Sequence, residues 1–300
     1  MFPARAFVLM VAFAAFFGMV DAVSAQPAPS SEFVLKPAGP WNLHGDKDSC
    51  KLRRGFGDGD QHVGIELVRY GPGDDMRVFL FGRPIAPLID DPRYTIAFGD
   101  FPPLQANTAL SAKDGAGIPV TIRWIGGIRE VDYRKLAEEK SKGLPITQAI
   151  TPTEEAAVRS IALSSGKLGK IVLQTGSMGP ALQLLRQCTD ELVRTWGADP
   201  KLELASRPKP RSPVQNWVDP NTIPQAAAVG NSGSMIYFRL SVDADGKVSQ
   251  CGIQQVINES AFDKAICAVL MKRAKFDPAR DKAGKAVPSY FRSSIRLMGG

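Results

Sequence analysis

Apolar residues at every second position mark five short segments within residues 33–200. The alternation is clearest in 62–70, where Val63, Ile65 and Leu67 share one face. Successive side chains of a strand point to opposite faces, so this spacing predicts strands with one buried face. The predicted strands lie at 62–70, 75–82, 95–98, 120–125 and 170–174.

Two other segments of this region predict helices. The first, 153–163, is expected to begin at a Thr cap, with Glu154 and Glu155 in its first turn, where carboxylates favour the helix dipole. The second, 177–196, has Pro180 in its first turn and Gly197 after its end. Its apolar stripe at helical spacing consists of Leu182, Leu185, Cys188, Leu192 and Trp196. We therefore expect an antiparallel α+β domain of unknown role over 33–200.

Residues 233–297 predict a second, smaller unit. Alternating apolar residues in 235–242 indicate a strand, and Asp-Ala-Asp-Gly at 243–246 indicates a tight turn, where Gly supplies the positive torsion. A second strand follows around Cys251 and Ile253. Helical spacing then appears in Phe262, Ile266, Val269 and Leu270, and Pro278 ends that helix. A final strand completes a predicted ββαβ arrangement, with one helix packed on a small antiparallel sheet.

The first 25 residues have the pattern of a secretory signal peptide. Arg5 supplies positive charge, 7–20 is apolar apart from Gly18, and Val23-Ser24-Ala25 offers small residues at the cleavage positions. The run is about fourteen residues long, shorter than the roughly twenty that span a bilayer. We expect a cleaved signal peptide over 1–25. The alternative is an uncleaved anchor, in which case the protein also contacts the membrane.

Residues 201–220 have the composition of a connector. The segment 205–213 is short and basic and contains Pro208, Pro210 and Pro213. Proline fixes the φ torsion and favours extended polyproline geometry, so we expect a semi-rigid linker. The predicted organisation is a signal peptide (1–25), an α+β domain (33–200), a Pro-rich linker (201–220) and a C-terminal domain (221–300).

Four cysteines in an exported chain indicate two disulfides, for which three connectivities are open. Cys50 and Cys188 lie in the N-terminal region, whereas Cys251 and Cys267 lie in a strand and in the helix expected to pack on it. Pairing within each region is the simplest choice, and free buried thiols are the alternative. A metal site is not expected, because neither C-x-x-C nor C-x-x-H spacing occurs.

The formal net charge of +7 is concentrated near the C-terminus. From Arg211 onward there are 12 Lys/Arg and 7 Asp/Glu, which leaves +5. A basic exported module favours acidic partners, such as a membrane surface, a polyanion or an acidic peptide. Nucleic acid is not an expected partner, because the chain is exported and lacks a basic stripe interleaved with aromatic residues.

The order of elements and motifs over residues 215–298 resembles the C-terminal domain of the TonB family. The matching motifs, in chain order, are Ile223-Pro224, Gly246-Lys247-Val248, Phe262-Asp263, and Phe276-x-Pro278-Ala279 with Gly284. Some branches of the family also place one cysteine in the second strand and one in the helix, as Cys251 and Cys267 stand here. The resemblance implies a periplasmic module that hands mechanical energy to outer-membrane transporters by pairing with a peptide from them.

The resemblance also implies that the partner peptide adds to the last strand, because an open sheet edge offers unpaired backbone groups. In this last strand, the side chains of Tyr290, Arg292, Ser294 and Arg296 are expected on an exposed, cationic face. Arg292 and Arg296 either meet acidic side chains of the peptide or form a solvated face that blocks aggregation. The expected binding residues are Ser289, Tyr290, Phe291, Arg292, Ser293, Ser294, Ile295 and Arg296.

Two other functions remain open. The family's transducers keep a membrane helix and a long Pro-rich spacer, so cleavage of the only apolar run favours a periplasmic binding or scaffold protein without energy transduction. A hydrolase in the N-terminal region is the third hypothesis, because Ser164-Ser165-Gly166-Lys167 fits the S-x-x-K pattern of serine acyl-enzymes. No S-D-N or K-T-G motif accompanies it.

The remaining candidate motifs indicate loops. The Gly-rich segment 55–59 lacks the Lys-Ser/Thr of a P-loop and precedes a strand. His44 and His62 belong to no catalytic motif. We therefore predict neither enzymatic activity nor a cofactor.

Overall fold

The computed structural model describes residues 32–91, 93–105, 109–132, 150–218, 235–254 and 260–296. The predicted signal peptide over 1–25 and the Ile223-Pro224 motif lie outside these ranges. Within them, no helix has the length and apolar character needed to cross a membrane. The structure contains both helices and strands, and the strands form several small, mainly antiparallel sheets. This confirms the α+β class.

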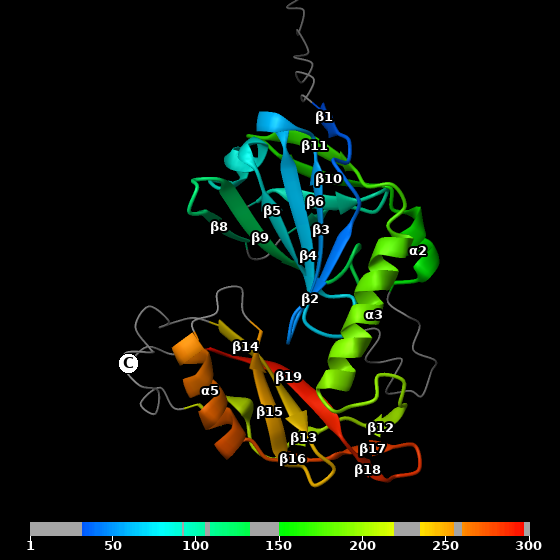
Figure 1. Cartoon of the computed structure of the whole chain (residues 1–300), viewed down its shortest axis with the longest axis vertical. Helices are drawn as coiled ribbons and strands as arrows, with labels where there is room; N and C mark the ends of the chain where they lie inside the picture. The colour runs from blue at the N-terminus through cyan, green and yellow to red at the C-terminus, as the bar shows by residue number, and fades with distance from the viewer. Residues whose placement is uncertain are drawn as a thin grey trace, which may run out of the picture. The chain divides into compact units, whose positions relative to one another are not determined.

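The N-terminal half, residues 32–198, contains two sheets (Figure 1). The six-stranded sheet runs β2 (Asn42–Gly45), β3 (Cys50–Phe56), β4 (Val63–Arg69), β5 (Met76–Phe81), β9 (Pro119–Ile125) and β8 (Ala109–Lys113). The five-stranded sheet runs β1 (Glu32–Leu35), β11 (Gly169–Gln174), β10 (Ser160–Ser165), β6 (Thr95–Phe98) and β7 (Leu104–Gln105). Its β1–β11 pair is parallel, in contrast to the antiparallel arrangement we predicted.

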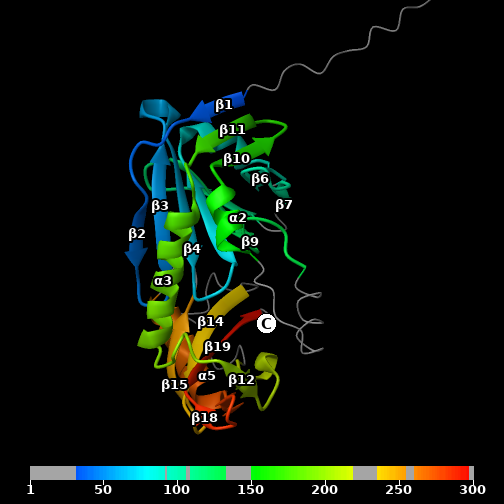
Figure 2. The ribbon, with the colours of Figure 1, turned by 90° about the vertical axis from the view of Figure 1, so that its right-hand side faces the viewer.

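Two helices complete this half. The helix α3 (Gly179–Thr195) lies alongside β3 and turns Leu182, Leu185 and Leu192 into the core (Figure 2). The shorter α2 (Pro152–Ala157) packs against α3. Short 3-10 segments, η1 (Gly59–Gln61) and η2 (Arg83–Leu88), lie in the connections.

The first predicted helix, 153–163, is wrong in its second half. The helix α2 begins earlier, because Thr151 accepts the N–H of Glu154 and the Glu154 carboxylate accepts the N–H of Thr151. It ends at Ala157, and Ser160–Ser165 instead pairs with β6 and β11 as β10. In β10, Ile161 and Leu163 are buried at a spacing of two, so sheet pairing overrides the local helical preference.

The C-terminal half, residues 204–296, has its own hydrophobic core. The strands β14 (Met235–Val242), β15 (Val248–Ile253) and β19 (Ser289–Arg296) form a sheet in the order β15-β14-β19, and α5 (Ser260–Arg273) packs against β15. Ile236, Phe238 and Leu240 of β14 face this core. The ββαβ order that we predicted is therefore observed among these residues.

The turn between β14 and β15 is hydrogen-bonded to Phe276, in the segment that follows α5. Asp243 Oδ1 accepts the N–H groups of Asp245 and Lys247, which closes the turn, and Gly246 has φ +79°. The Gly246 carbonyl accepts the N–H of Phe276 at 3.1 Å, so a Cβ on Gly246 would collide with the Phe276 carbonyl. Glycine is therefore required at this position.

The predicted linker is part of the folded C-terminal half. Its strands β12 (Leu204–Ser206) and β13 (Lys209–Pro210) pair with β17 (Ala279–Asp281) and β16 (Phe276–Asp277), and β17 also pairs with β18 (Ala286–Val287). A 3-10 segment, η3 (Val214–Asn216), follows, and Trp217 is buried in the core of this half. The polyproline connector that we expected over these residues is thus replaced by short sheets, because β16 and β17 supply backbone partners.

Candidate functional site

All eight residues predicted to bind a partner lie in β19. The strand pairs with β14 over its full length, from Ser289 opposite Val242 to Arg296 opposite Met235. The sheet order places β19 at one end, and no other described strand pairs with it. Along the part of the chain that the structure describes, its outer edge therefore offers unpaired backbone N–H and C=O groups.

One face of β19 is anchored by aromatic residues. The ring of Phe291 lies 5.1 Å from that of Phe276 and 6.0 Å from that of Trp217, and Ile295 is buried in the same core. Such edge and tilted ring pairs add to the stabilisation from burial alone. The strand is thus held firmly from one side.

The N-terminal half lies against the opposite face of β19, so our prediction of an exposed face is wrong at Tyr290, Arg292 and Ser294, which are half-buried. The ring of Tyr290 lies 5.1 Å from that of Trp196 at the end of α3. Arg292 donates from Nε to Gln254 Oε1 at 3.1 Å and forms an ion pair with Asp75 at 3.6 Å. Of the two arginines expected to meet a peptide, only Arg296 is exposed.

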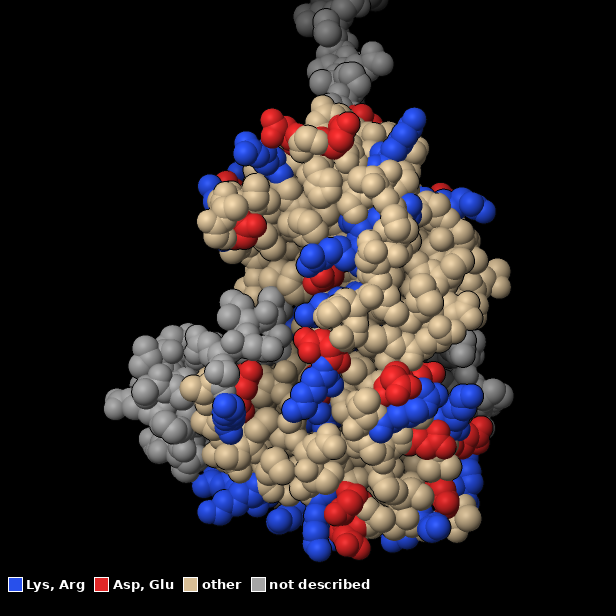
Figure 3. Space-filling model, viewed as in Figure 1, with Lys and Arg blue, Asp and Glu red and all other residues tan. Residues whose placement is uncertain are grey.

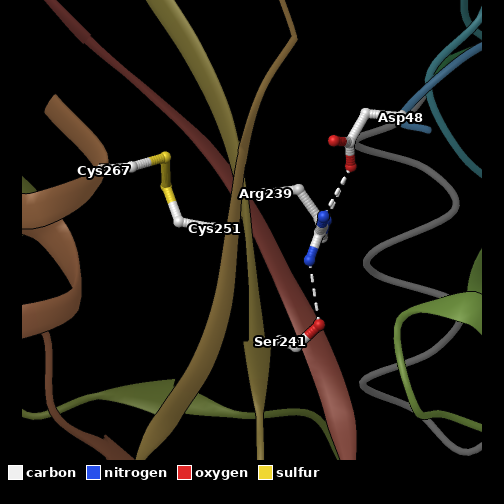
Figure 4. Close-up of a disulfide and its surroundings, with 5 residues drawn as sticks. All are labelled: Asp48, Arg239, Ser241, Cys251 and Cys267. Atoms are coloured by element: carbon white, nitrogen blue, oxygen red, sulfur yellow. Dashed lines mark hydrogen bonds and ion pairs between the residues drawn. A yellow bond between two sulfur atoms is a disulfide. The ribbon is translucent and has the colours of Figure 1, made fainter. Parts of the chain in front are cut away.

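A buried ion pair joins the central strand of this sheet to the N-terminal half (Figure 4). Nε and Nη2 of Arg239 donate to Asp48 Oδ1 at 3.0 and 2.6 Å, and Nη1 donates to Ser241 Oγ at 2.9 Å. The Arg239 side chain has no exposed surface, and that of Asp48 is 14% exposed. Arg239 lies on the sheet face opposite the disulfide that ties β15 to α5. Charged residues therefore lie buried on the face of this sheet that we predicted to be exposed to solvent.

A second set of contacts surrounds Gln254, just after β15. The side-chain Nε2 of Gln254 donates to the backbone carbonyl of Tyr70 at 2.8 Å. The backbone carbonyl of Gln254 accepts from Arg77 Nη2, also at 2.8 Å. Beside it, the rings of Trp124 and Tyr237 lie 4.5 Å apart. Desolvation by burial lowers the pKa of Arg77 and raises that of Tyr70.

Two clefts lie where the halves meet. The first, of about 290 Å³, is lined by Arg77, Trp124, Tyr237 and Arg292, and it reaches β19 at Ser293 and Ser294. The second, of about 470 Å³, runs between the segment after β2 and the β15–α5 pair. Acidic and basic side chains both line it, and Figure 3 shows the two signs interspersed on this face.

Both disulfides pair cysteines within one half, as the simplest connectivity predicted. Cys50 at the start of β3 is bonded to Cys188 of α3, and Cys251 of β15 is bonded to Cys267 of α5. Each bond therefore fixes a helix to a sheet. The disulfide prediction is confirmed in both cases.

The other candidate residues lie apart from these clefts. Ser164 belongs to β10 and pairs with Lys170, whereas Lys167 is exposed in the turn that follows. His44 is exposed in β2, and His62 follows η1. Within the described ranges, no three His, Cys, Asp or Glu side chains gather in a way that could hold a metal ion.

Sequence reasoning missed the residues that join the halves. Asp48, Arg77 and Gln254 belong to no motif, and their partners lie 177 to 191 positions away in the chain. The signal that could have found them is Arg239, a charged residue in the middle of an apolar strand, which requires a buried partner.

Comparison of the chain with protein-family models, with curated proteins and with solved structures found no match.

Proposed function

We propose that this chain is an exported periplasmic protein of TonB type that binds an extended segment of a partner protein by strand addition to β19. The single observation that carries the proposal is the position of β19 at the end of its sheet, with no described strand on its outer side. A peptide paired there gains backbone hydrogen bonds, each of which stabilises by about 1 kcal/mol. An outer-membrane transporter is the partner that the TonB resemblance suggests.

The connection between the halves favours binding without energy transduction. Residues 204–210 pair with β16 and β17, and Arg239 forms its ion pair with Asp48. A transducer of this kind needs a long free spacer to reach across the periplasm. We therefore rank a periplasmic binding or scaffold role, linked to outer-membrane transport, above direct transduction. For the hydrolase hypothesis, no contact between Ser164 and Lys167 supports a catalytic pair.

A pair of proline variants tests strand addition. In an antiparallel pair, consecutive residues direct their N–H groups to opposite sides, so one of Ser293 and Ser294 donates toward β14 and the other toward the free edge. Proline removes the N–H in either case. We expect one of Ser293→Pro and Ser294→Pro to unfold more easily, and the other to stay stable while losing partner binding.

Partner binding is read by photo-crosslinking from position 296 in the periplasm, followed by identification of the captured protein. Arg280 is the matched control, because it is also an exposed arginine but lies on β17, which has a strand on both sides. The proposal is supported if a partner protein is captured from position 296 but not from position 280, and if the stable proline variant does not capture it from position 296. Equal capture by the stable proline variant contradicts it.

A further inference from the structure

The first cleft contains an arginine, Arg77, that has no acidic partner among the residues that the structure describes. Arg77 is 4% exposed, and it donates to Tyr70 Oη at 2.9 Å and to the Gln254 carbonyl at 2.8 Å, both of which are neutral. A guanidinium has five N–H groups. Among the described residues, no ion pair joins Arg77 to a carboxylate, whereas the fully buried Arg239 has Asp48.

Aromatic rings partly compensate this buried charge. The Arg77 guanidinium lies 4.4 Å from the ring centre of Tyr70, 4.6 Å from that of Trp124 and 5.2 Å from that of Tyr237. Ring faces attract a cation, but more weakly than a carboxylate that accepts hydrogen bonds. The arrangement holds the guanidinium in place at the wall of a cleft and leaves donors for a ligand.

A second guanidinium lies at the same cleft. Arg292 lines it from β19, and its side chain is 23% exposed. Its ion pair with Asp75 is long, at 3.6 Å. Counting Arg77 and Arg292 against Asp75, the lining carries one net positive charge. A ligand with a single negative charge matches this balance, whereas a doubly charged phosphate would also meet the repulsion of Asp75.

We propose that this cleft binds a carboxylate, held by the guanidinium groups of Arg77 and Arg292. Arginine matches a carboxylate because its N–H groups form a planar fork that can meet both oxygens. The carboxylate could belong to a free organic acid or to an acidic side chain of a peptide. Ser293 and Ser294 of β19 line the cleft, so a side chain of a strand added to β19 lies within reach.

The binding test uses the full chain and propionate, a free acid with one negative charge, and binding is followed by calorimetry and by tryptophan fluorescence, to which Trp124 in the cleft contributes. We expect propionate to bind and its affinity to fall about tenfold or more in Arg77→Met and in Arg292→Gln. Arg83→Gln is the control, because Arg83 is an exposed arginine paired with Asp60 outside the cleft. Arg77→Lys keeps the charge without the fork and is expected to bind with intermediate affinity.

A peptide arm separates the two sources of the carboxylate. The probes are an acetylated and amidated heptapeptide of alternating Thr and Val with a central Glu, and its twin with Gln. Tighter binding of the Glu peptide, with competition by propionate, supports a peptide source, and binding of propionate alone supports a free acid. Equal binding of both peptides without propionate binding refutes the carboxylate site while supporting strand addition. Binding of none of the three probes also refutes the site, and so does an unchanged affinity in Arg77→Met with an intact circular dichroism spectrum.

Discussion

The ion pair between Arg239 and Asp48 is expected to be a major stabilising contact between the two halves. Asp48→Asn keeps the shape of the side chain but leaves Arg239 buried and charged beside a neutral group. Arg239 is fully buried, so water cannot replace the lost carboxylate. Breaking a buried pair in this way costs about 3 to 5 kcal/mol. We expect Asp48→Asn to lower the free energy of unfolding by about 3 kcal/mol.

Replacing Arg239 instead of Asp48 should lower the free energy of unfolding by a smaller amount. In Arg239→Met, Asp48 keeps its charge, but its side chain is 14% exposed and lines the cleft of about 470 Å³, where water can reach it. We expect a loss of about 1 to 2 kcal/mol from this variant, including the lost hydrogen bond to Ser241. The double variant Asp48→Asn/Arg239→Met should lose less than the sum of the two single variants, because it contains no uncompensated buried charge.

Urea unfolding of the oxidised protein at neutral pH measures these free energies by linear extrapolation. The Asp46→Asn variant is a suitable control, because Asp46 lies two residues away and its side chain is 52% exposed. Its ion pair with Lys51 is long, at 3.6 Å, and Asn can still accept the N–H of Lys47 as Asp46 does. A change below about 0.5 kcal/mol is expected there. If Asp48→Asn loses no more than this control, the reasoning on the buried pair is refuted.

Three further predictions follow from local contacts. Replacing both Cys251 and Cys267 by Ala should lower the free energy of unfolding by roughly 3 kcal/mol in urea, since the bond closes a loop of about 15 residues, and a loss below about 1 kcal/mol would contradict this. Hydrogen bonds from Arg129 and from the N–H of Thr151 lower the pKa of Glu154 from 4.5 to about 2, so its stabilisation is present above pH 4.5 and is lost as pH falls through about 2. The melting temperature of the native protein should therefore fall more between about pH 6 and pH 2 than that of Glu154→Gln, and equal falls would count against this role. Ser164→Ala should leave both the melting temperature and partner capture unchanged, and loss of a hydrolytic activity in this variant would revive the enzyme hypothesis.

Elements with a regular apolar spacing could be predicted from the sequence. The strands β4, β5 and β14 and the helix α3 appear close to their expected positions, because each directs a periodic set of apolar residues into a core, although β4 is buried on both faces. The strand β3 was missed, since Arg53 and Arg54 interrupt its apolar positions. In the structure, Arg53 forms an ion pair with Glu66 at 2.7 Å, and Arg54 donates to the Thr175 carbonyl at 2.7 Å. Glu66 belongs to β4 and Thr175 follows β11, so the local sequence around β3 does not indicate these partners.

In the candidate site, too, the features set by local sequence could be predicted, whereas contacts between residues far apart in the chain could not. The position of β19 and its core-facing residues follow from alternation and from the TonB-like order of motifs. The cover over its other face does not, because Trp196, Asp75 and Asp48 reach the C-terminal sheet only through the folding of the whole chain. Arg292 accordingly contacts the protein itself, although its sequence context resembles that of a solvent-facing residue on an edge strand.

Amide hydrogen exchange along β19 tests the central claim most directly and needs no partner. If the outer edge of β19 is free, alternate N–H groups between residues 289 and 296 should exchange slowly, where β14 accepts them, and the groups between them should exchange fast. Slow exchange at every one of these residues in the isolated protein would contradict the account, because it would mean that the edge is already occupied.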